Sequence, residues 1–402
     1  MMMPFDVARV RGLTPAIGDG WVHLDAPTGA QCPEQVALTM GTAVRAPISP
    51  PGEAFPASQR AEVIEDAARQ AIADLVGADP RGVVLGPGRE VLIGRLATAL
   101  APSWQLGDQI VLSRLDDVAN VAPWRGAAEA RGIGVRWAEI EIETCELPEW
   151  QYEQLLGGGS VRLVAVTAGS EHVGTRPDVA RIAQRAHRAN ALVVVDGYAA
   201  AACGPLRMNE LGADVLVLTA SAWGGPQCGA LVFADPGLLD RLPSCSLDPL
   251  ATGPERLEVG PHCYPLLAGL VASIDYLSTL DDEAQGERPD RLATSMRSVG
   301  QYQSELMEKL IYELKFVPRI TIVGDPSGGV PALSFTHDGR KSQDVAAYLA
   351  DRGVCAVADM GDHGVLEHLG SGEVGGVVRI GLAHYTTTSE IDQLARALNE
   401  MV

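Results

Sequence analysis

The chain is very poor in lysine and in positive charge overall. Its 402 residues include three lysines, Lys309, Lys315 and Lys341, and the formal net charge is −20. Such acidity, with no cluster of basic residues to offset it, argues against a nucleic-acid-binding surface and disfavours anionic membranes. We therefore expect neither nucleic acid nor membrane among the partners.

Long apolar runs and paired cysteines are missing as well. No stretch of about 18 uninterrupted apolar residues is present, so we expect no transmembrane span. The N-terminal stretch MMMPFDVARVRG lacks the apolar core of a signal peptide, which predicts a cytoplasmic location. The seven cysteines are scattered without C-x-x-C spacing, which argues against a disulfide framework and against a zinc site. We expect no metal.

What the chain does have is an alternation of short apolar segments with helical patterns. Apolar residues make up 47% and charged residues 20%, as in ordinary globular proteins. The apolar segments are short and rich in β-branched residues, which is typical of buried parallel strands. They are Val83–Leu85, Gln109–Leu112, Val135–Trp137, Val161–Val166, Ala191–Val195, Val215–Thr219 and Ala230–Phe233. This predicts an α/β fold whose central sheet is covered on both faces.

The length exceeds what one simple core supports and predicts more than one domain. We expect an N-terminal arm over 1–30 that ends in a short strand, and a large α/β domain over 31–280 with helices at 59–78, at about 89–100 and at 261–280. A small α+β domain should follow over 281–402, with the polar stretch 281–292 as a hinge. Its expected helices are 293–315, 342–352 and 388–400, and its expected strands lie near 319–323, 331–335 and 377–382.

One segment carries a family resemblance. Val215–Phe233, VLVLTASAWGGPQCGALVF, closely resembles the cofactor-lysine segment of class V aminotransferases and cysteine desulfurases, which typically reads S-x-H-K-x-x-G-P. Counting back from Gly225-Pro226 places the lysine slot at Ala222. A lysine there forms the Schiff base with pyridoxal phosphate (PLP), and an alanine cannot. The resemblance covers nearly the whole chain and implies fold type I of the PLP enzymes, with a mostly parallel large-domain sheet and a smaller α+β C-terminal domain.

Several residues match the family's motifs. Asp196 in VVVDGYAAA would pair with the pyridinium nitrogen of PLP, although an aspartate at a strand end also serves as a helix N-cap. Asn120 belongs to a segment that resembles the family's N-x-x-P-W. Arg379 in VVRIGLAHYTTTSEID would clamp a substrate carboxylate, although a lone arginine on a strand is also a common ion-pair partner. Thr219 and Ser221 stand where the family contacts phosphate.

The phosphate-cradle position is occupied by VLGPGREVLIGRL, 84–96. Gly86 and Gly88 remain, so a glycine-rich turn and a helix N-terminus could still face an anion. Arg89 could attract a phosphate, whereas Glu90 would repel one unless it points away.

Other slots depart from the family. The stacking histidine is Asp117, the asparagine that contacts the PLP hydroxyl is Glu171, and the partner-subunit threonine is Pro261. The loop near 359–372, which carries the nucleophilic cysteine of desulfurases, contains none. The resemblance thus implies a vestigial pocket formed by Gly86, Gly88, Arg89, Asp117, Asn120, Glu171, Asp196, Thr219, Ser221, Ala222 and Trp223.

Three functions remain open. The first is a degenerate member that is inactive, or repurposed to bind a small anionic or amino-acid-like ligand, or a subunit beside an active paralogue. The second is a residual aminotransferase or cysteine desulfurase/lyase that holds PLP non-covalently. The third is a different reaction without PLP, using acid–base groups among Asp117, Glu171, His172 and Asp196. The family's dimers imply a homodimer.

Overall fold

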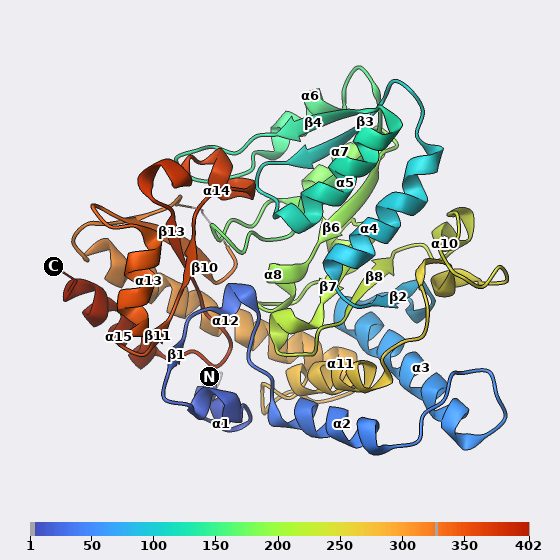
Figure 1. Ribbon diagram of the computed structural model, residues 1–402, viewed down its shortest axis with the longest axis horizontal. Coiled ribbons are helices and arrows are strands. Elements are labelled where there is room, and N and C mark those ends of the chain that lie inside the picture. The colour runs from blue at the N-terminus through green and yellow to red at the C-terminus, as the bar shows by residue number, and fades with distance from the viewer. Residues whose placement is uncertain (1–4, 326–328, 402) are drawn as a thin grey trace.

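A seven-stranded sheet forms the centre of the large domain in the computed structural model, which describes residues 5–325 and 329–401 (Figure 1). The strand order is β2-β8-β7-β6-β5-β3-β4, and only β8 runs antiparallel to its neighbours. The strands are β2 Val83–Gly86, β3 Asp108–Ser113, β4 Gly134–Ala138, β5 Ser160–Thr167, β6 Leu192–Asp196, β7 Val215–Thr219 and β8 Gly229–Phe233. This confirms the predicted, mostly parallel sheet.

Helices cover both faces of this sheet. One apolar core packs the sheet against α3, α7 and α11, and a second packs the opposite face against α4 and α5. Because both faces are covered, β7 and β8 are buried throughout and read as continuous apolar runs rather than alternating ones. The helices up to this domain's end are α1 Val7–Gly12, α2 Glu34–Arg45, α3 Pro56–Val76, α4 Arg89–Leu100, α5 Val118–Arg131, α6 Tyr152–Leu156, α7 Val179–Arg188, α8 Tyr198–Ala201, α9 Met208–Leu211, α10 Gly237–Arg241 and α11 Tyr264–Leu277.

The C-terminal part forms a second sheet with its own core. Its order is β12-β13-β10-β9, all antiparallel, and its apolar face packs against α12, α13 and α15. A capping box between Thr387 and Glu390 begins α15. The elements are α12 Arg288–Lys315, β9 Ile320–Ile322, β10 Ala332–His337, α13 Ser342–Ala350, β11 Val354–Cys355, β12 Val357–Asp359, α14 Gly364–His368, β13 Val377–Gly381 and α15 Thr388–Asn399.

Two boundaries differ from those expected from the sequence. The strand of the N-terminal arm, β1 Val22–His23, pairs in parallel with β11, so the arm joins the C-terminal sheet region (Figure 1). The expected hinge over 281–292 is wrong at its end, because α12 already begins at Arg288. Its polar side chains fit a helix start, where Pro289 takes an early position that needs no N–H partner.

The topology brings the ends of distant segments together. The carboxyl ends of β5, β6 and β7 lie at one edge of the large sheet, which is where α/β proteins generally bind ligands. The N-termini of α4 and α5 reach the same edge. Among the described residues no helix combines the length and apolarity needed to cross a bilayer.

Candidate functional site

The guanidinium of Arg89 lies at the centre of a buried carboxylate cluster. Its Nη1 donates to Asp196 at 3.0 Å. Its Nη2 donates to Asp117 at 3.0 Å and to Glu171 at 2.9 Å. The guanidinium carbon also stands 4.2 Å from the ring centre of Tyr198, a cation–π contact. Three predicted site residues therefore converge on a fourth, which is itself only 7% exposed.

Each of these side chains is placed by the end of a secondary-structure element. Asp196 is the last residue of β6, and Glu171 lies in the turn that follows β5. Asp117 caps α5 by accepting the N–H of Ala119 at 2.9 Å. Arg89 is the first residue of α4, directly after the turn that follows β2. Positions more than a hundred apart in sequence meet because these ends share one edge of the sheet.

Charge at the cluster is unbalanced, with one guanidinium facing three carboxylates. Burial works against the charged form of Arg89, but Asp196, Glu171 and Asp117 outweigh it and raise its pKa. Burial raises the pKa of Glu171 and of Asp196. Burial also opposes ionisation of Asp117, yet the hydrogen bond with His172 and the charge of Arg89 bring its pKa below the usual value. Removing the guanidinium would leave these acids without a counter-charge.

A fourth acid, Asp116, lies beside the cluster and was not predicted. It is fully buried, and burial raises its pKa to about 8 despite hydrogen bonds from Ser113 and Asn120. Asn120 in turn accepts from Trp124 at 3.2 Å. The predicted site residue Asn120 is thus engaged with Asp116 rather than with Arg89. In the sequence, Asp116 could have been noticed only because it stands directly before Asp117.

The phosphate-cradle segment is occupied by internal contacts. Thr219 accepts the backbone N–H of Arg89 at 3.1 Å, so a helix N-terminal donor is already satisfied. Gly86 is required for packing, because a Cβ there would stand 2.6 Å from Leu92. Glu90 points to solvent, with its side chain 64% exposed. Glu90, the acid expected to repel a phosphate unless it points away, thus turns away from the site.

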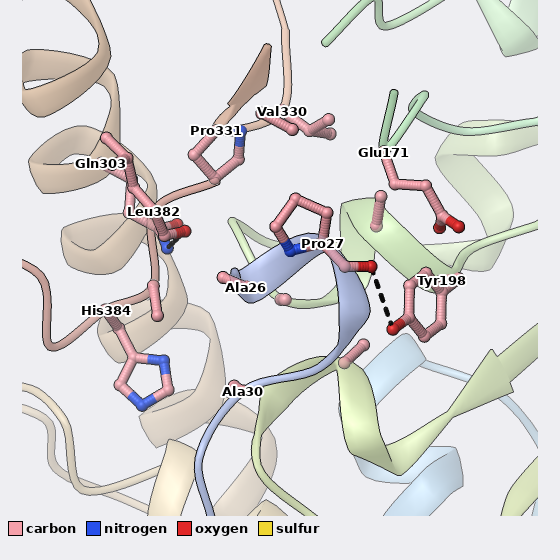
Figure 2. A pocket seen from close by; sticks show the side chains of 15 residues that line it. Ala26, Pro27, Ala30, Glu171, Tyr198, Gln303, Val330, Pro331, Leu382 and His384 are labelled. Carbon is pink, nitrogen blue, oxygen red and sulfur yellow. Dashed lines mark hydrogen bonds between the residues drawn. The ribbon is translucent and has the colours of Figure 1, made fainter. Parts of the chain in front are cut away.

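Ala222 borders a very small cavity. Figure 2 shows it between Glu171 and Tyr198 on one side and Gln303, Pro331 and His384 on the other. Its volume is about 40 Å³, enough for a few waters only, whereas ordinary ligand pockets measure about 300–1,000 Å³. Pro27 of the N-terminal arm enters it and accepts a hydrogen bond from the Tyr198 hydroxyl at 3.4 Å (Figure 2).

The other residues of the lysine segment contact the protein interior. Trp223 is fully buried and donates to Ser273 at 3.0 Å, so it belongs to the core and does not line the cavity. The carbonyl of Ser221 accepts the N–H of Ala30 at 2.9 Å, which ties the arm to this segment. Gly224, at φ +92°, allows the carbonyl of Gln31 to approach, because a Cβ would stand 2.6 Å from it.

Arg379 also has an internal partner. It lies in β13, is 8% exposed, and donates to Asp359 of β12 at 3.2 Å. Asp359 is in turn 3.9 Å from Nδ1 of His172, whose Nε2 lies 3.1 Å from Asp117. A row of polar and charged side chains therefore lies between the expected substrate arginine and the Arg89 cluster. Asp359 could not be assigned from the sequence, because it follows no family motif.

Comparison with known proteins places the chain in context. The sequence model of the family Aminotransferase class-V matches residues 22–394. An uncharacterised protein of Mycobacterium tuberculosis is 48% identical over 98% of this chain and 99% of its own length. An aminotransferase-like protein of Gibberella zeae is 28% identical over 99% of this chain and 98% of its own length.

Solved structures share the fold along the whole chain. The apo cysteine desulfurase of Thermococcus onnurineus is 21% identical, with a TM-score of 0.88 over 100% of this chain and 99% of that chain. The cysteine desulfurase CsdA of Escherichia coli is 24% identical, with a TM-score of 0.84 over 99% and 98%. A lysine-to-alanine mutant of C-DES, with glycine covalently linked to the PLP cofactor, is 19% identical, with a TM-score of 0.80 over 97% and 99%.

Proposed function

The chain belongs to the aminotransferase class-V family, and we propose that it is a member whose cofactor site is filled by its own side chains. The family and its neighbours in structure are PLP-dependent. The single observation that carries the proposal is the position of the Arg89 guanidinium. It is bonded to the residues that occupy three family slots around the PLP ring: Asp117, Glu171 and Asp196.

These residues do not suit PLP in this arrangement. The guanidinium is planar and cationic, and it donates to Asp196 as a pyridinium would. It stacks on Tyr198 at 4.2 Å, which leaves no room for a second ring on that face. Asp117 has no aromatic face to cover a cofactor, and Ala222 has no amine to bind one. The cavity beside Ala222 has a volume of about 40 Å³, which is far smaller than the pockets of about 300–1,000 Å³ that hold cofactors and other small molecules.

The substrate half of the site is filled in the same way. The resemblance assigns Arg379 to a substrate carboxylate, and the carboxylate of Asp359 occupies it at 3.2 Å. A small anionic or amino-acid-like ligand would therefore have to share Arg379 with Asp359 or displace it, since one N–H of the guanidinium is already taken and its Nε–H is buried without a partner. It must also approach a cluster in which acids outnumber the one guanidinium, so the charge balance disfavours an anion close to Arg89. A catalytically silent protein accounts for both filled positions.

A second candidate is a residual PLP enzyme that holds the cofactor without a Schiff base. The observation that favours it is the C-DES mutant, which is solved with PLP although a lysine is replaced by alanine. In this chain the cofactor would require Arg89 to swing out of the cluster. That movement leaves Asp117, Glu171 and Asp196 without the cation that now compensates them, which is costly in a buried site.

The test is an equilibrium titration with PLP, followed by visible absorption and by gel filtration. The proposal expects no cofactor retained at one molecule per chain. Slow adducts at Lys309, Lys315 or Lys341 are removed by a triple Lys→Arg variant, which serves as the matched background. Saturable, stoichiometric PLP in that background would favour the residual enzyme.

We also propose a homodimer. Exposed apolar side chains lie on α2 and α3, both of which pack on α11 (Figure 1). Leu38 is 64% exposed, Val44 69% and Val63 65%. Such a group is best covered by a second copy across a two-fold axis. Light scattering should give twice the chain mass, reduced by Leu38→Asp with Val63→Asp but not by Leu106→Asp, whose side chain is also exposed. A monomeric mass for the unmodified chain would contradict the dimer.

A further inference from the structure

A second and much larger cavity lies along α12, between the large domain and the C-terminal part. Its volume is about 520 Å³, within the range of about 300–1,000 Å³ that small-molecule sites occupy. Its walls come from α12, from β9 and the start of β10, and from the turn that follows β5. A boundary between two parts of a fold is a common place for a ligand site.

One face of α12 supplies the longest wall. The lining positions recur at intervals of three and four residues and include Gly300, Gln303, Met307, Ile311 and Leu314. Such spacing places side chains on one side of a helix, and the helix rises by about 21 Å from the first to the last. Met307 and Ile311 are only partly buried against the C-terminal core, so they leave apolar surface for a ligand to cover.

The wall formed by β9 and β10 is fixed by backbone hydrogen bonds. The N–H of Val323, just after β9, donates to the carbonyl of Ser334 in β10 at 2.8 Å. The N–H of Val330 donates to the carbonyl of Gly174 at 2.8 Å, which ties the approach to β10 to the turn that follows β5. The cavity is therefore formed without a ligand, as small-molecule sites usually are.

One buried polar group in the lining has an atom without a partner. Gln303 is 2% exposed and contributes to this cavity and to the small one beside Ala222 (Figure 2). Its Nε2 donates to the carbonyl of Leu382 at 3.3 Å, which fixes the orientation of the amide because only the nitrogen can donate. Its Oε1 is buried and accepts no hydrogen bond from the described residues. A buried acceptor of this kind favours a ligand that donates to it.

Charged side chains line the cavity only where it meets solvent. Glu308, Lys315 and Asp325 are exposed, whereas Gln303 and Cys203 are buried. Burial raises the pKa of the Cys203 thiol to about 11, so the buried part of the lining is uncharged. A charged group brought to Gln303 would lose its hydration without meeting a counter-charge, which is costly.

We propose that this cavity binds a neutral small molecule with an apolar body and one hydroxyl or amide N–H, which donates to Oε1 of Gln303. The apolar body would lie along α12 against Met307 and Ile311. Covering apolar surface would supply most of the affinity, and the single donor would set the orientation. The inference is independent of the proposed function, because it uses no residue of the Arg89 cluster.

Four eight-carbon probes, titrated by calorimetry into the full chain, test this chemistry. 1-Octanol donates and accepts, 2-octanone only accepts, and octanoate and octylammonium carry opposite charges at neutral pH. Ile311→Trp would fill the cavity from the wall of α12. Leu106→Trp is the matched control, because Leu106 is 90% exposed and is not part of the lining. Gln303→Met keeps the side-chain length and removes the acceptor.

The proposal expects one molecule of 1-octanol per chain, bound about tenfold or more tightly than 2-octanone, whose carbonyl would face the oxygen of Gln303. Ile311→Trp should weaken binding of 1-octanol by about tenfold or more, with Leu106→Trp unchanged. Gln303→Met should lower the affinity for 1-octanol to that for 2-octanone.

Absence of saturable 1-octanol binding to the unmodified chain would overturn the proposal. Equal affinity for 1-octanol and 2-octanone would do the same, since Oε1 of Gln303 would then not need a donor from the ligand. Tighter binding of octanoate or octylammonium would contradict a neutral ligand. These three comparisons use the unmodified chain and do not depend on the folding of any variant. Unchanged 1-octanol affinity in folded Ile311→Trp would place the probe elsewhere and overturn the proposal equally.

Discussion

Replacing Arg89 by methionine should destabilise the protein more than any surface arginine does. Methionine keeps most of the side-chain length, so the variant removes charge and hydrogen bonds rather than volume. Two buried carboxylates, Glu171 and Asp196, and the partly buried Asp117 would lose their common donor. Removing one partner from a buried ion pair costs about 3–5 kcal/mol, and the lost stacking on Tyr198 adds about 0.5–2 kcal/mol.

Proton uptake limits this loss. Without the guanidinium, burial raises the folded-state pKa of Glu171 and of Asp196 further above the unfolded values, so the folded variant binds protons that the unfolded chain has released. Its stability then increases as pH falls, by up to about 1.4 kcal/mol per proton per pH unit. We therefore expect a loss of about 3.5–7 kcal/mol at pH 8 and a clearly smaller one at pH 5. Total stabilities are about 5–15 kcal/mol, so the effect is large.

Urea unfolding at pH 5, 6.5 and 8 measures this directly through the midpoint and the slope. Arg125→Met is the matched control, because Arg125 is 56% exposed and its contact with Glu129 is 3.8 Å long. That control should lose at most about 0.5 kcal/mol. A loss for Arg89→Met no greater than the control, or one that does not depend on pH, would refute the reasoning.

Three further variants follow from the same contacts. Ala222→Lys alone should retain no PLP, because Arg89 still fills the ring site, whereas the double variant with Arg89→Ala should retain measurably more in an absorption titration; equal retention in both would contradict this. Asp359→Asn should free Arg379 and raise the affinity for a small carboxylate such as alanine in calorimetry, and an unchanged affinity would mean that Asp359 does not block the arginine. Burial alone would raise the pKa of Glu258, but its hydrogen bonds with His262 and Arg69 outweigh burial and lower the pKa to about 2. This contribution is present above the unfolded pKa of about 4.5 and is lost as pH falls towards 2, so Glu258→Gln should cost about 3 kcal/mol at pH 7 and little at pH 2; a constant cost would contradict the assignment.

Much of the fold was predictable because its segments are locally consistent. The apolar runs are short and β-branched, and every strand predicted for the large sheet occurs within a few residues of its expected bounds. The helix ending at Gly77, φ +71°, carried both helical spacing and a left-handed glycine stop. The 12-residue helix α2 and the 5-residue helix α14 were missed.

The sequence predicted which residues form much of the site but not which hydrogen bonds and ion pairs they make. Matching the chain to the family's motifs identified Asp117, Glu171 and Asp196 as site residues, because the spacing within each motif fixes which residue stands at each position. That Arg89 bonds to all three depends on the rotamer of one long side chain, which no spacing encodes. Asn120 and Trp223 were assigned to the pocket, but their hydrogen bonds to Asp116 and Ser273 direct them into the core. Asp359 was missed because a β-strand, not a motif, places it beside Arg379.

The central claim is that Arg89 occupies the ring site, and a crystal structure of the protein grown with excess PLP tests it most directly. The account predicts density for a guanidinium bonded to Asp117, Glu171 and Asp196, with no cofactor beside Ala222. Density for a PLP ring between Asp117 and Tyr198, with Arg89 turned out of the cluster, would contradict it.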